Sequence, residues 1–414
     1  MGVVLALIPR CASAQQPLTW DQVKAKFEAT NPALKADADN VDEMRAEEIT
    51  AYLRPNPQLT VGADGTQIAP HDGVWAPFRG TDFVPSVSYL HERDHKRELR
   101  LESAQEGTRI SEATHEDLQR NLEFTLRAAF VETLEAKAVL DMAKADLDYY
   151  DKIIEISRDR LKAGDIAEID FDRIELLRVQ YESELQTAIV NLRTAKIQLL
   201  QLLNDRTPLD QFDVTGIFDF SDSLDPLDSF HQTALAARPD LQAALETIQQ
   251  SETNHKLAIS NGSTDPTLSA WYTWNASNNN PNATRTLGAS VNIPLRIFDK
   301  NQGEKRRTQI DIDRAQQASE AARGQVFSDV DTAYELVHSN IELLKPYKAK
   351  YNDEALRVRD TVSYAYFHGG ASLMDFLNAQ SDYRQVQLAY TQLIGAYLTS
   401  AAQLNLAVGR EVIP

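Results

Sequence analysis

Two acidic side chains follow glycine turns in segments that lie half a chain apart. In "AGDIAEIDFD", Gly164 precedes Asp170 by six positions, and in "HGGASLMDFL", Gly369 precedes Asp375 by the same six. A carboxylate at such a place could attract cations, or it could simply stabilise a helix N-terminus through the helix dipole. Because an Asp-Phe pair recurs at the same offset from glycine, we favour a shared functional role over two unrelated helix ends.

Residues typical of enzymes are sparse in this chain. His91 and His95, in "HERDH", lie four positions apart and could form a metal-binding pair on a helix face, but no third ligand lies nearby in the sequence. A junction between a strand and a helix is the favoured interpretation of this segment. No HExxH motif, glycine-rich phosphate loop or GxSxG motif occurs, and Cys11 is the only cysteine. The sequence therefore predicts no enzyme, no catalytic residue, and no bound metal or cofactor.

Net charge and the first residues restrict the partners and the compartment. The 414 residues carry a formal net charge of −19, which argues against nucleic acid because phosphates would be repelled. The opening "MGVVLALIPRCASAQQ" has a short apolar run before an Ala-x-Ala motif, which predicts a signal peptide over residues 1–14. The positively charged segment that normally begins such a peptide is missing, which indicates a truncated start. Lipidation of Cys11 is the alternative, and the neighbouring Pro9 and Arg10 disfavour it.

The chain is predicted to be a tandem repeat. "PNPQLTVGA" in the first half matches "TDPTLSAWY" in the second, and "NPALKAD" matches "RPDLQAA". Each half follows the order helix, strand, strand, long helix, glycine turn and helix, and a linker rich in Asp, Pro and Phe separates the halves. We therefore expect a first repeat over residues 15–203, an equatorial linker over 204–226, and a second repeat over 227–414.

Long helices are predicted on both sides of each glycine turn. From Leu126 to Leu161, apolar or small residues recur at steps of three and four, which is a heptad pattern. A helix from about Arg93 to Leu161 would be roughly 100 Å long at about 1.5 Å per residue. Pro346 should interrupt and bend the corresponding helix of the second half. Each half therefore carries a long antiparallel helical hairpin with its glycine turn at the tip.

Four strands are predicted, and they have the character of membrane strands. Between Thr267 and Asn275, apolar and aromatic residues alternate with mostly polar ones, which is typical of transmembrane β-barrels. Four strands cannot close a barrel and lipid does not tolerate open sheet edges, so several copies must share one barrel. Two copies would supply eight strands and three would supply twelve, of which only twelve leave a pore, so we expect a cyclic trimer. The expected strands are Gln58–Ile68, Phe83–Leu90, Thr267–Asn275 and Thr286–Leu295.

The duplicated layout, the paired strands between long helices and the two tip motifs resemble the TolC family of outer-membrane efflux proteins. The resemblance extends from Trp20 to Gly409. It implies a mainly α fold with a transmembrane β-barrel portion, in which a homotrimer forms a twelve-stranded barrel in the outer membrane and an α-helical tunnel in the periplasm. It also implies a tripartite efflux system, in which the duct contacts a periplasmic adaptor (membrane fusion) protein and an inner-membrane RND-type pump and passes their cargo outside.

The same resemblance implies roles for residues at the hairpin tips. Asp170 and Asp375 match aspartates of the periplasmic gate, and Tyr366 matches a tyrosine that holds neighbouring helices closed. Asn378 stands where the best-known member has a second gate aspartate, and Ala371 stands where it has an arginine, so the closed-state bonds should differ. The turn residues expected to contact the adaptor are Gly164, Asp165, Gly369 and Gly370.

Two functions of different class stay open at this point. The first is the exit duct of a tripartite efflux system, and "AGDIAEIDFDRIEL" looks most like the heavy-metal, CzcC-like branch of the family. The second is a periplasmic coiled-coil structural or adaptor protein without a membrane barrel, which would have no need of aromatic-rich strand pairs. The sequence does not identify the cargo, whether metal cations or drugs, or the particular adaptor and pump.

Overall fold

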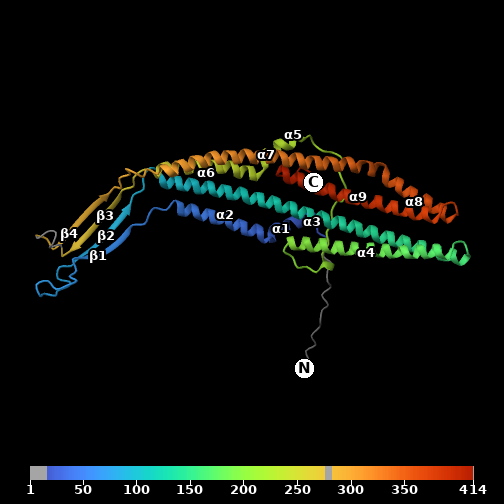
Figure 1. The fold of residues 1–414 in the computed structure, drawn as a ribbon, viewed down its shortest axis with the longest axis horizontal. Helices are drawn as coiled ribbons and strands as arrows, with labels where there is room; N and C mark the ends of the chain where they lie inside the picture. The colour runs from blue at the N-terminus through green and yellow to red at the C-terminus, as the bar shows by residue number, and fades with distance from the viewer. Residues whose placement is uncertain (1–15, 276–281, 414) are drawn as a thin grey trace, which may run out of the picture. The chain divides into compact units, whose positions relative to one another are not determined.

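The computed structural model describes residues 16–275 and 282–413. The predicted signal peptide and Cys11 lie outside the described residues. Four strands and a set of long helices occupy the places expected from the sequence (Figure 1). The helices are α1 (Trp20–Thr30), α2 (Pro32–Ala51), α3 (Lys96–Ala163), α4 (Glu168–Leu202), α5 (Leu227–Ala237), α6 (Pro239–Ser260), α7 (Gln302–Pro346), α8 (Asn352–Phe367) and α9 (Leu373–Val408). The strands are β1 (Gln58–Asp64), β2 (Asp82–Leu90), β3 (Thr267–Trp274) and β4 (Arg285–Asn292).

The long helices begin and end where the local chemistry requires. α3 runs unbroken for 68 residues and stops before Gly164, whose φ of +83° ends the helix without the steric cost that a side chain would meet. In the second half α7 stops at Pro346, and Tyr347–Tyr351 form a single π-helical turn before α8. The predicted interruption at Pro346 is therefore confirmed, because proline has no N–H to continue the helical hydrogen bonds.

The described chain divides into two compact units. One unit contains the residues up to Asp37, His115–Pro239 and those from Arg323 onwards. The other contains Ala38–Thr114 and Asp240–Ala322, and it includes the whole β-sheet. Each unit combines segments from both halves of the sequence, and α3 and α7 contribute residues to both.

All four strands form one antiparallel sheet in the order β1-β2-β3-β4. In the observed register Leu59 pairs with Val87, Val87 with Ala270, and Ala270 with Ala289, so these four lie on one face. That face is apolar except for Arg285, which pairs with Trp274 at the start of β4, whereas the opposite face is largely polar. The apolar face consists of Leu59, Val61, Ala63, Phe83, Pro85, Val87, Tyr89, Leu268, Ala270, Tyr272, Trp274, Leu287, Ala289 and Val291.

β3 ends one residue before the predicted Asn275, and two other strands end several residues early. β1 ends at Asp64 and not at Ile68, because Gly65 adopts φ +74° and turns the chain away from the sheet. β4 ends at Asn292 and not at Leu295, since Pro294 has no N–H with which to continue the strand pairing.

Trp271 is a large aromatic residue on the polar face, and Gly288 explains how it fits there. The two residues are directly paired across β3 and β4. A Cβ at position 288 would lie 2.4 Å from the Trp271 indole, so only glycine leaves room for the ring at this place.

The unit that contains the helix tips has an apolar core at its centre. Val23 and Phe27 of α1 are fully buried against Leu126 of α3 and Leu199 of α4. The linker takes part in this core, because Val214 is fully buried and the Leu18 N–H donates to the Asp213 carbonyl at 2.9 Å. The part of the predicted linker around Val214 therefore packs into this core.

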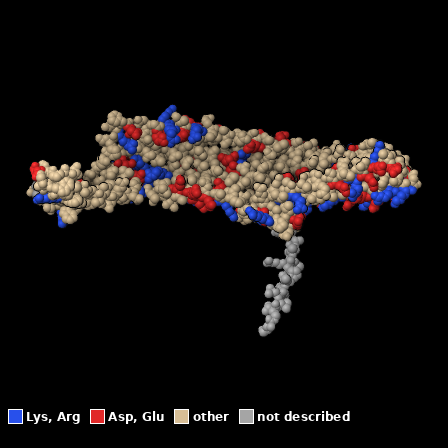
Figure 2. Space-filling view, turned by 60° about the horizontal axis from the view of Figure 1, so that its bottom comes forward, with Lys and Arg blue, Asp and Glu red and all other residues tan. Residues whose placement is uncertain are grey.

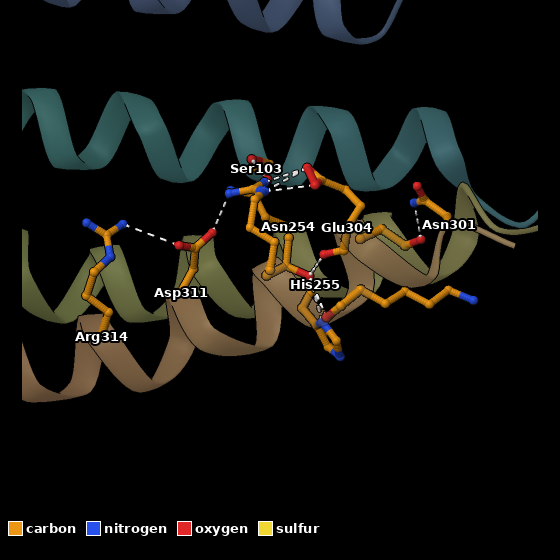
Figure 3. A network of polar contacts seen from close by, with 11 residues as sticks. Ser103, Asn254, His255, Asn301, Glu304, Asp311 and Arg314 are labelled. Carbon is orange, nitrogen blue, oxygen red and sulfur yellow. Dashed lines mark hydrogen bonds and ion pairs between the residues drawn. The ribbon is translucent and has the colours of Figure 1, made fainter. Parts of the chain in front are cut away.

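Polar contacts join the helices of the unit that contains the sheet. On α3, the Ser103 hydroxyl lies 2.7 Å from Oδ1 of Asn254 on α6 (Figure 3). Nδ1 of His255 on α6 lies 2.8 Å from the hydroxyl of Thr308 on α7, and Asn301 donates to the Ala258 carbonyl at 2.8 Å. Directional bonds of this kind fix how the helices are aligned along their length, which apolar contacts alone would leave less specific.

Candidate gate at the hairpin tips

The turn between α3 and α4 is a complete Schellman motif. The Asp165 N–H donates to the Arg160 carbonyl at 2.9 Å, and the Gly164 N–H donates to the Leu161 carbonyl at 3.0 Å. These are the two bonds that define the motif, and they satisfy carbonyl groups that the helix end would otherwise leave free. Gly164 occupies the left-handed position, with φ +83°.

The turn between α8 and α9 repeats this geometry. The Gly370 N–H donates to the Ala365 carbonyl at 2.7 Å, the Gly369 N–H donates to the Tyr366 carbonyl at 3.2 Å, and Gly369 has φ +78°. An added Cβ at Gly164 or Gly369 would meet no atom within 4 Å. Both glycines are therefore required for their backbone conformation, and the space beside them is open.

Asp375 caps the helix that follows its turn. The Asp375 N–H donates to the Ser372 hydroxyl at 3.1 Å, and the Ser372 N–H and hydroxyl both donate to the Asp375 carboxylate, at 3.2 and 2.7 Å. These bonds from the side chain and the backbone of Ser372 lower the pKa of Asp375. The interaction is a capping box, so this aspartate has at least a structural role at the start of α9.

Asp170 occupies the same third position of α4 but lacks such a cap. Ala167 precedes α4 and has no side chain that could accept a hydrogen bond. Asp170 is half-buried, and its backbone N–H donates to the Ala167 carbonyl at 3.1 Å. Its carboxylate raises the pKa of Tyr366, in addition to the larger effect of burial, so the two side chains are close enough to influence each other.

Tyr366 lies inside the tip and brings the two hairpins together. Its ring stacks on Phe376 of α9 at 4.8 Å between centroids, and the guanidinium carbon of Arg160, on α3, lies 5.1 Å from the ring centre. The Tyr366 hydroxyl and Nη1 of Arg160 are both buried, and neither has a hydrogen-bond partner within the described chain. Phe171, which follows Asp170 in sequence, belongs to the same buried cluster.

Further arginines and tyrosines join the helices behind the tip, and the sequence did not reveal them. The Arg359 guanidinium lies 4.9 Å from the Tyr149 ring and 4.2 Å from the Tyr383 ring. Arg384 lies 4.4 Å from the Tyr181 ring. Such contacts attract a cation to the face of an aromatic ring. The tyrosines within the apolar heptads were the feature of the sequence that could have revealed these contacts, because a buried tyrosine needs a polar partner.

The remaining tip residues are at the surface. Asp165, Gly369, Gly370 and Asn378 are all exposed, and the turn residue Gly164 is exposed as well. The space-filling view shows acidic and basic side chains mixed at the helical end of the chain (Figure 2). The tips thus present both charge and accessible backbone to a partner.

His91 and His95 do not form a pair on a helix face. His91 follows β2 and His95 precedes α3 in a left-handed backbone conformation, so the expected junction between strand and helix is confirmed. Among the described residues no group of three or more His, Cys, Asp or Glu side chains is placed to hold a metal ion, and no helix is long and apolar enough to cross a membrane.

Comparison with known proteins agrees with this architecture. The sequence model of a family described as "Outer membrane efflux protein" matches residues 231–410. Over 420 aligned positions the chain is 22% identical to the cobalt-zinc-cadmium resistance protein CzcC of Cupriavidus metallidurans, covering 98% of this chain and 93% of that protein.

Solved structures of outer-membrane channels have the same fold. CusC superposes with a TM-score of 0.81 at 16% identity, covering 96% of this chain and 94% of that one. The MtrE channel of Neisseria gonorrhoeae gives 0.77 at 17%, covering 95% and 89%. The VceC protein of Vibrio cholerae gives 0.74 at 14%, covering 95% and 97%.

Of the two functions predicted from the sequence, the efflux duct is therefore confirmed, and the coiled-coil protein without a membrane portion is wrong. Channels of this family form trimers and catalyse no reaction. Residues 231–410 match the outer membrane efflux protein family, and the chain is an outer-membrane efflux channel with a helical tunnel on the periplasmic side.

Proposed function

We propose that three copies of this chain form one duct, which receives cargo from a periplasmic adaptor and an inner-membrane RND-type pump. The observation that carries the proposal is the sheet, which has one apolar face and one largely polar face. β1 and β4 are its two edges, and an unpaired edge in lipid leaves backbone groups unsatisfied. Pairing β4 of one copy with β1 of the next removes every edge, and three copies give twelve strands around a pore.

An exposed stripe on α4 supports contact between copies. Ile169, Leu176, Val190 and Ile197 are 60, 72, 58 and 53% exposed, and they lie at multiples of seven residues from one another. A seam of this spacing is what a neighbouring helix packs against in a coiled coil. Mass determination of the detergent-extracted protein should give a trimer, and a monomer or dimer would refute the proposal.

We infer that the tips form the periplasmic gate and that Asp170, Asp375, Tyr366 and Asn378 contribute to it. Three copies bring six carboxylates of Asp170 and Asp375 to one opening, where like charges repel unless cations offset them. The buried, unpartnered hydroxyl of Tyr366 and Nη1 of Arg160 support a closed state in which a neighbouring copy completes their hydrogen bonds.

Single-channel conductance in planar bilayers tests the gate. The wild type should be cation-selective, and Asp170→Ala with Asp375→Ala should lose much of that selectivity and resist block by trivalent cations. The matched control is Glu168→Gln with Asp172→Asn, which removes the same formal charge from exposed positions of the first tip. Equal loss in both double variants would mean that general tip charge, and not these two aspartates, determines selectivity.

Adaptor docking is proposed at the turn residues Gly164, Asp165, Gly369 and Gly370. Their exposure and open surroundings support it. Photo-crosslinking groups placed at Asp165 and Gly370 in cells should capture the adaptor. Capture only from the exposed linker residue Asp210 would place the docking surface elsewhere.

For the cargo we propose divalent metal cations. The supporting observations are the likeness to a cobalt-zinc-cadmium resistance protein and the acidic tips. A deletion strain should become sensitive to these metals and regain resistance with the wild-type gene. Sensitivity to organic drugs alone would refute the metal assignment.

We also propose that the chain is a tandem repeat, with a first repeat over residues 15–203, a linker over 204–226 and a second repeat over 227–414. The two equivalent hairpin tips support this division.

A further inference from the structure

The segment that follows β4 exposes more apolar surface than any other connection between a strand and a helix in the described chain. Ile293, Leu295, Ile297 and Phe298 are 55, 79, 65 and 89% exposed. They come after the end of β4 at Asn292 and before α7 begins at Gln302. In a water-exposed connection, four such side chains in six residues would be unfavourable.

This segment continues the apolar face of the sheet. Leu287, Ala289 and Val291 are the members of that face on β4, and Ile293 and Leu295 extend the same alternation in sequence past the end of the strand. Arg296, the only charged residue before Asp299, is half-buried. The apolar surface thus continues past Asn292, the last residue of β4, and ends at Phe298, where Asp299 and Lys300 introduce charge.

The length of β4 compared with the thickness of a membrane barrel's apolar band also indicates that the apolar surface extends past the strand. The 8 residues of β4 would span about 19 Å of bilayer at about 3.3 Å per residue and a tilt of about 45°. The apolar band of a membrane barrel is about 25 Å tall. Continuing the extended chain from Arg285 to Leu295 raises the span to about 26 Å under the same assumptions.

Part of the backbone of the segment has hydrogen-bond partners without strand pairing. Pro294 has no N–H, and its carbonyl accepts from the Thr264 hydroxyl at 3.2 Å. The Ile297 N–H donates to the Leu295 carbonyl at 3.0 Å, and the Phe298 carbonyl accepts from the Gln302 side chain at 3.1 Å. Irregular backbone at a membrane surface requires such internal partners.

The equivalent segment of the first repeat has none of these properties. With Val87 aligned on Val291, Tyr89 corresponds to Ile293, whereas His91 and Arg93 correspond to Leu295 and Ile297. The connection from β2 to α3 is therefore already polar at positions where the connection from β4 to α7 is still apolar. Because the two connections are equivalent in the repeat, a general requirement of the fold does not explain the difference.

We propose that Ile293–Phe298 lies in the periplasmic leaflet of the outer membrane and contacts lipid acyl chains, so that each copy carries one apolar anchor beneath its strands. This inference rests on the proposed trimeric barrel. The continuity with the apolar sheet face favours lipid over a second protein copy as the occupant.

Spin-label accessibility tests this assignment on the full-length trimer in vesicles of phosphatidylethanolamine and phosphatidylglycerol. Single cysteines are introduced at Val291, Leu295 and Phe298 in a Cys11→Ser background, and His91→Cys and Arg93→Cys are the matched controls. Collisions with oxygen report lipid, and collisions with a water-soluble nickel chelate report solvent. Labels at Leu295 and Phe298 should resemble the label at Val291, with oxygen collisions several-fold above those of the controls and little effect of nickel.

The possible outcomes separate the inference from the proposed function. Nickel access at Leu295 and Phe298, with lipid exposure kept at Val291, would overturn the anchor and leave the barrel intact. Shielding from both reagents would show that a neighbouring copy covers the segment, which also overturns it. Nickel access at Val291 itself would refute the membrane position of the sheet, and the anchor with it.

Discussion

Replacing Gly164 with alanine should loosen the first hairpin tip without disturbing its packing. The residue has φ +83°, and an added Cβ would meet no atom within 4 Å, so the whole effect comes from the backbone. An L-residue in the left-handed region costs about 1–2 kcal/mol, and alanine regains about 0.4–1 kcal/mol by restricting the unfolded chain. The net destabilisation should be about 1 kcal/mol, which corresponds to roughly fivefold more frequent local opening.

Hydrogen exchange measures this opening directly. The Asp165 amide donates the bond that closes the motif, to the Arg160 carbonyl at 2.9 Å, so its exchange reports the integrity of the turn. Exchange followed by mass spectrometry of peptides spanning the tip should accelerate about fivefold in Gly164→Ala. Gly369→Ala should have the same effect at the second tip, because its geometry is equivalent.

Gly324→Ala in α7 is the matched control. It adds the same methyl group where no atom lies within 4 Å and where φ is not positive, so it should stabilise the helix by about 0.5–1 kcal/mol. If Gly164→Ala and Gly324→Ala changed exchange at the tip equally, or not at all, the conformational explanation of the tip glycines would be wrong.

Three other substitutions have specific expected outcomes. Gly288→Val should lower the thermal midpoint of the sheet by circular dichroism, because a Cβ there lies 2.4 Å from the Trp271 indole and overpacking costs about 1–3 kcal/mol. Asp265→Asn should destabilise by about 3–5 kcal/mol in thermal or chemical unfolding, since it leaves the ammonium of Lys96, whose side chain is 3% exposed, without its counter-charge at 2.5 Å. Ser372→Ala should cost about 1 kcal/mol through loss of the helix cap, seen as faster hydrogen exchange in the first turn of α9.

The Asp265 prediction also has a definite pH dependence. Its pKa lies below the ordinary 3.8, because hydrogen bonds from Lys96 and from the Arg93 N–H outweigh the opposing effect of burial. The stabilisation is therefore present above pH 3.8 and is lost as the pH falls through the lowered value. Acidification through this range should lower the thermal midpoint of the wild type more than that of Asp265→Asn, and parallel curves would contradict the assignment.

Local patterns in the sequence were sufficient for the elements and for the tips. Strand residues alternate between two faces, so the apolar set Leu268, Ala270, Tyr272 and Trp274 could be recognised before its neighbours were known. Steps of three and four residues identified α3 for the same reason. Each glycine turn was visible because a left-handed residue at a helix end strongly favours glycine.

Contacts between distant segments could not be predicted in the same way. Arg160 lies beside Tyr366 from another helix, and Gln380 reaches Tyr149 across 231 positions of sequence. Nothing in either local segment specifies its partner, because the pairing depends on how two hairpins pack against each other. The same holds for Trp271, whose place on a polar face follows from Gly288 on the neighbouring strand.

The two aspartates proposed for the gate separate what the sequence determined from what the structure decided. The sequence by itself determined that Asp170 and Asp375 occupy equivalent positions after equivalent turns, because identity and spacing are properties of the chain alone. The capping box of Asp375 with Ser372 is a local contact within three residues, whereas only the tertiary structure showed that Asp170 lies half-buried near Tyr366 of the other hairpin. The difference arises because a carboxylate takes the partners that its surroundings offer: Ser372 precedes α9, whereas Ala167 precedes α4 and the fold brings Tyr366 near Asp170.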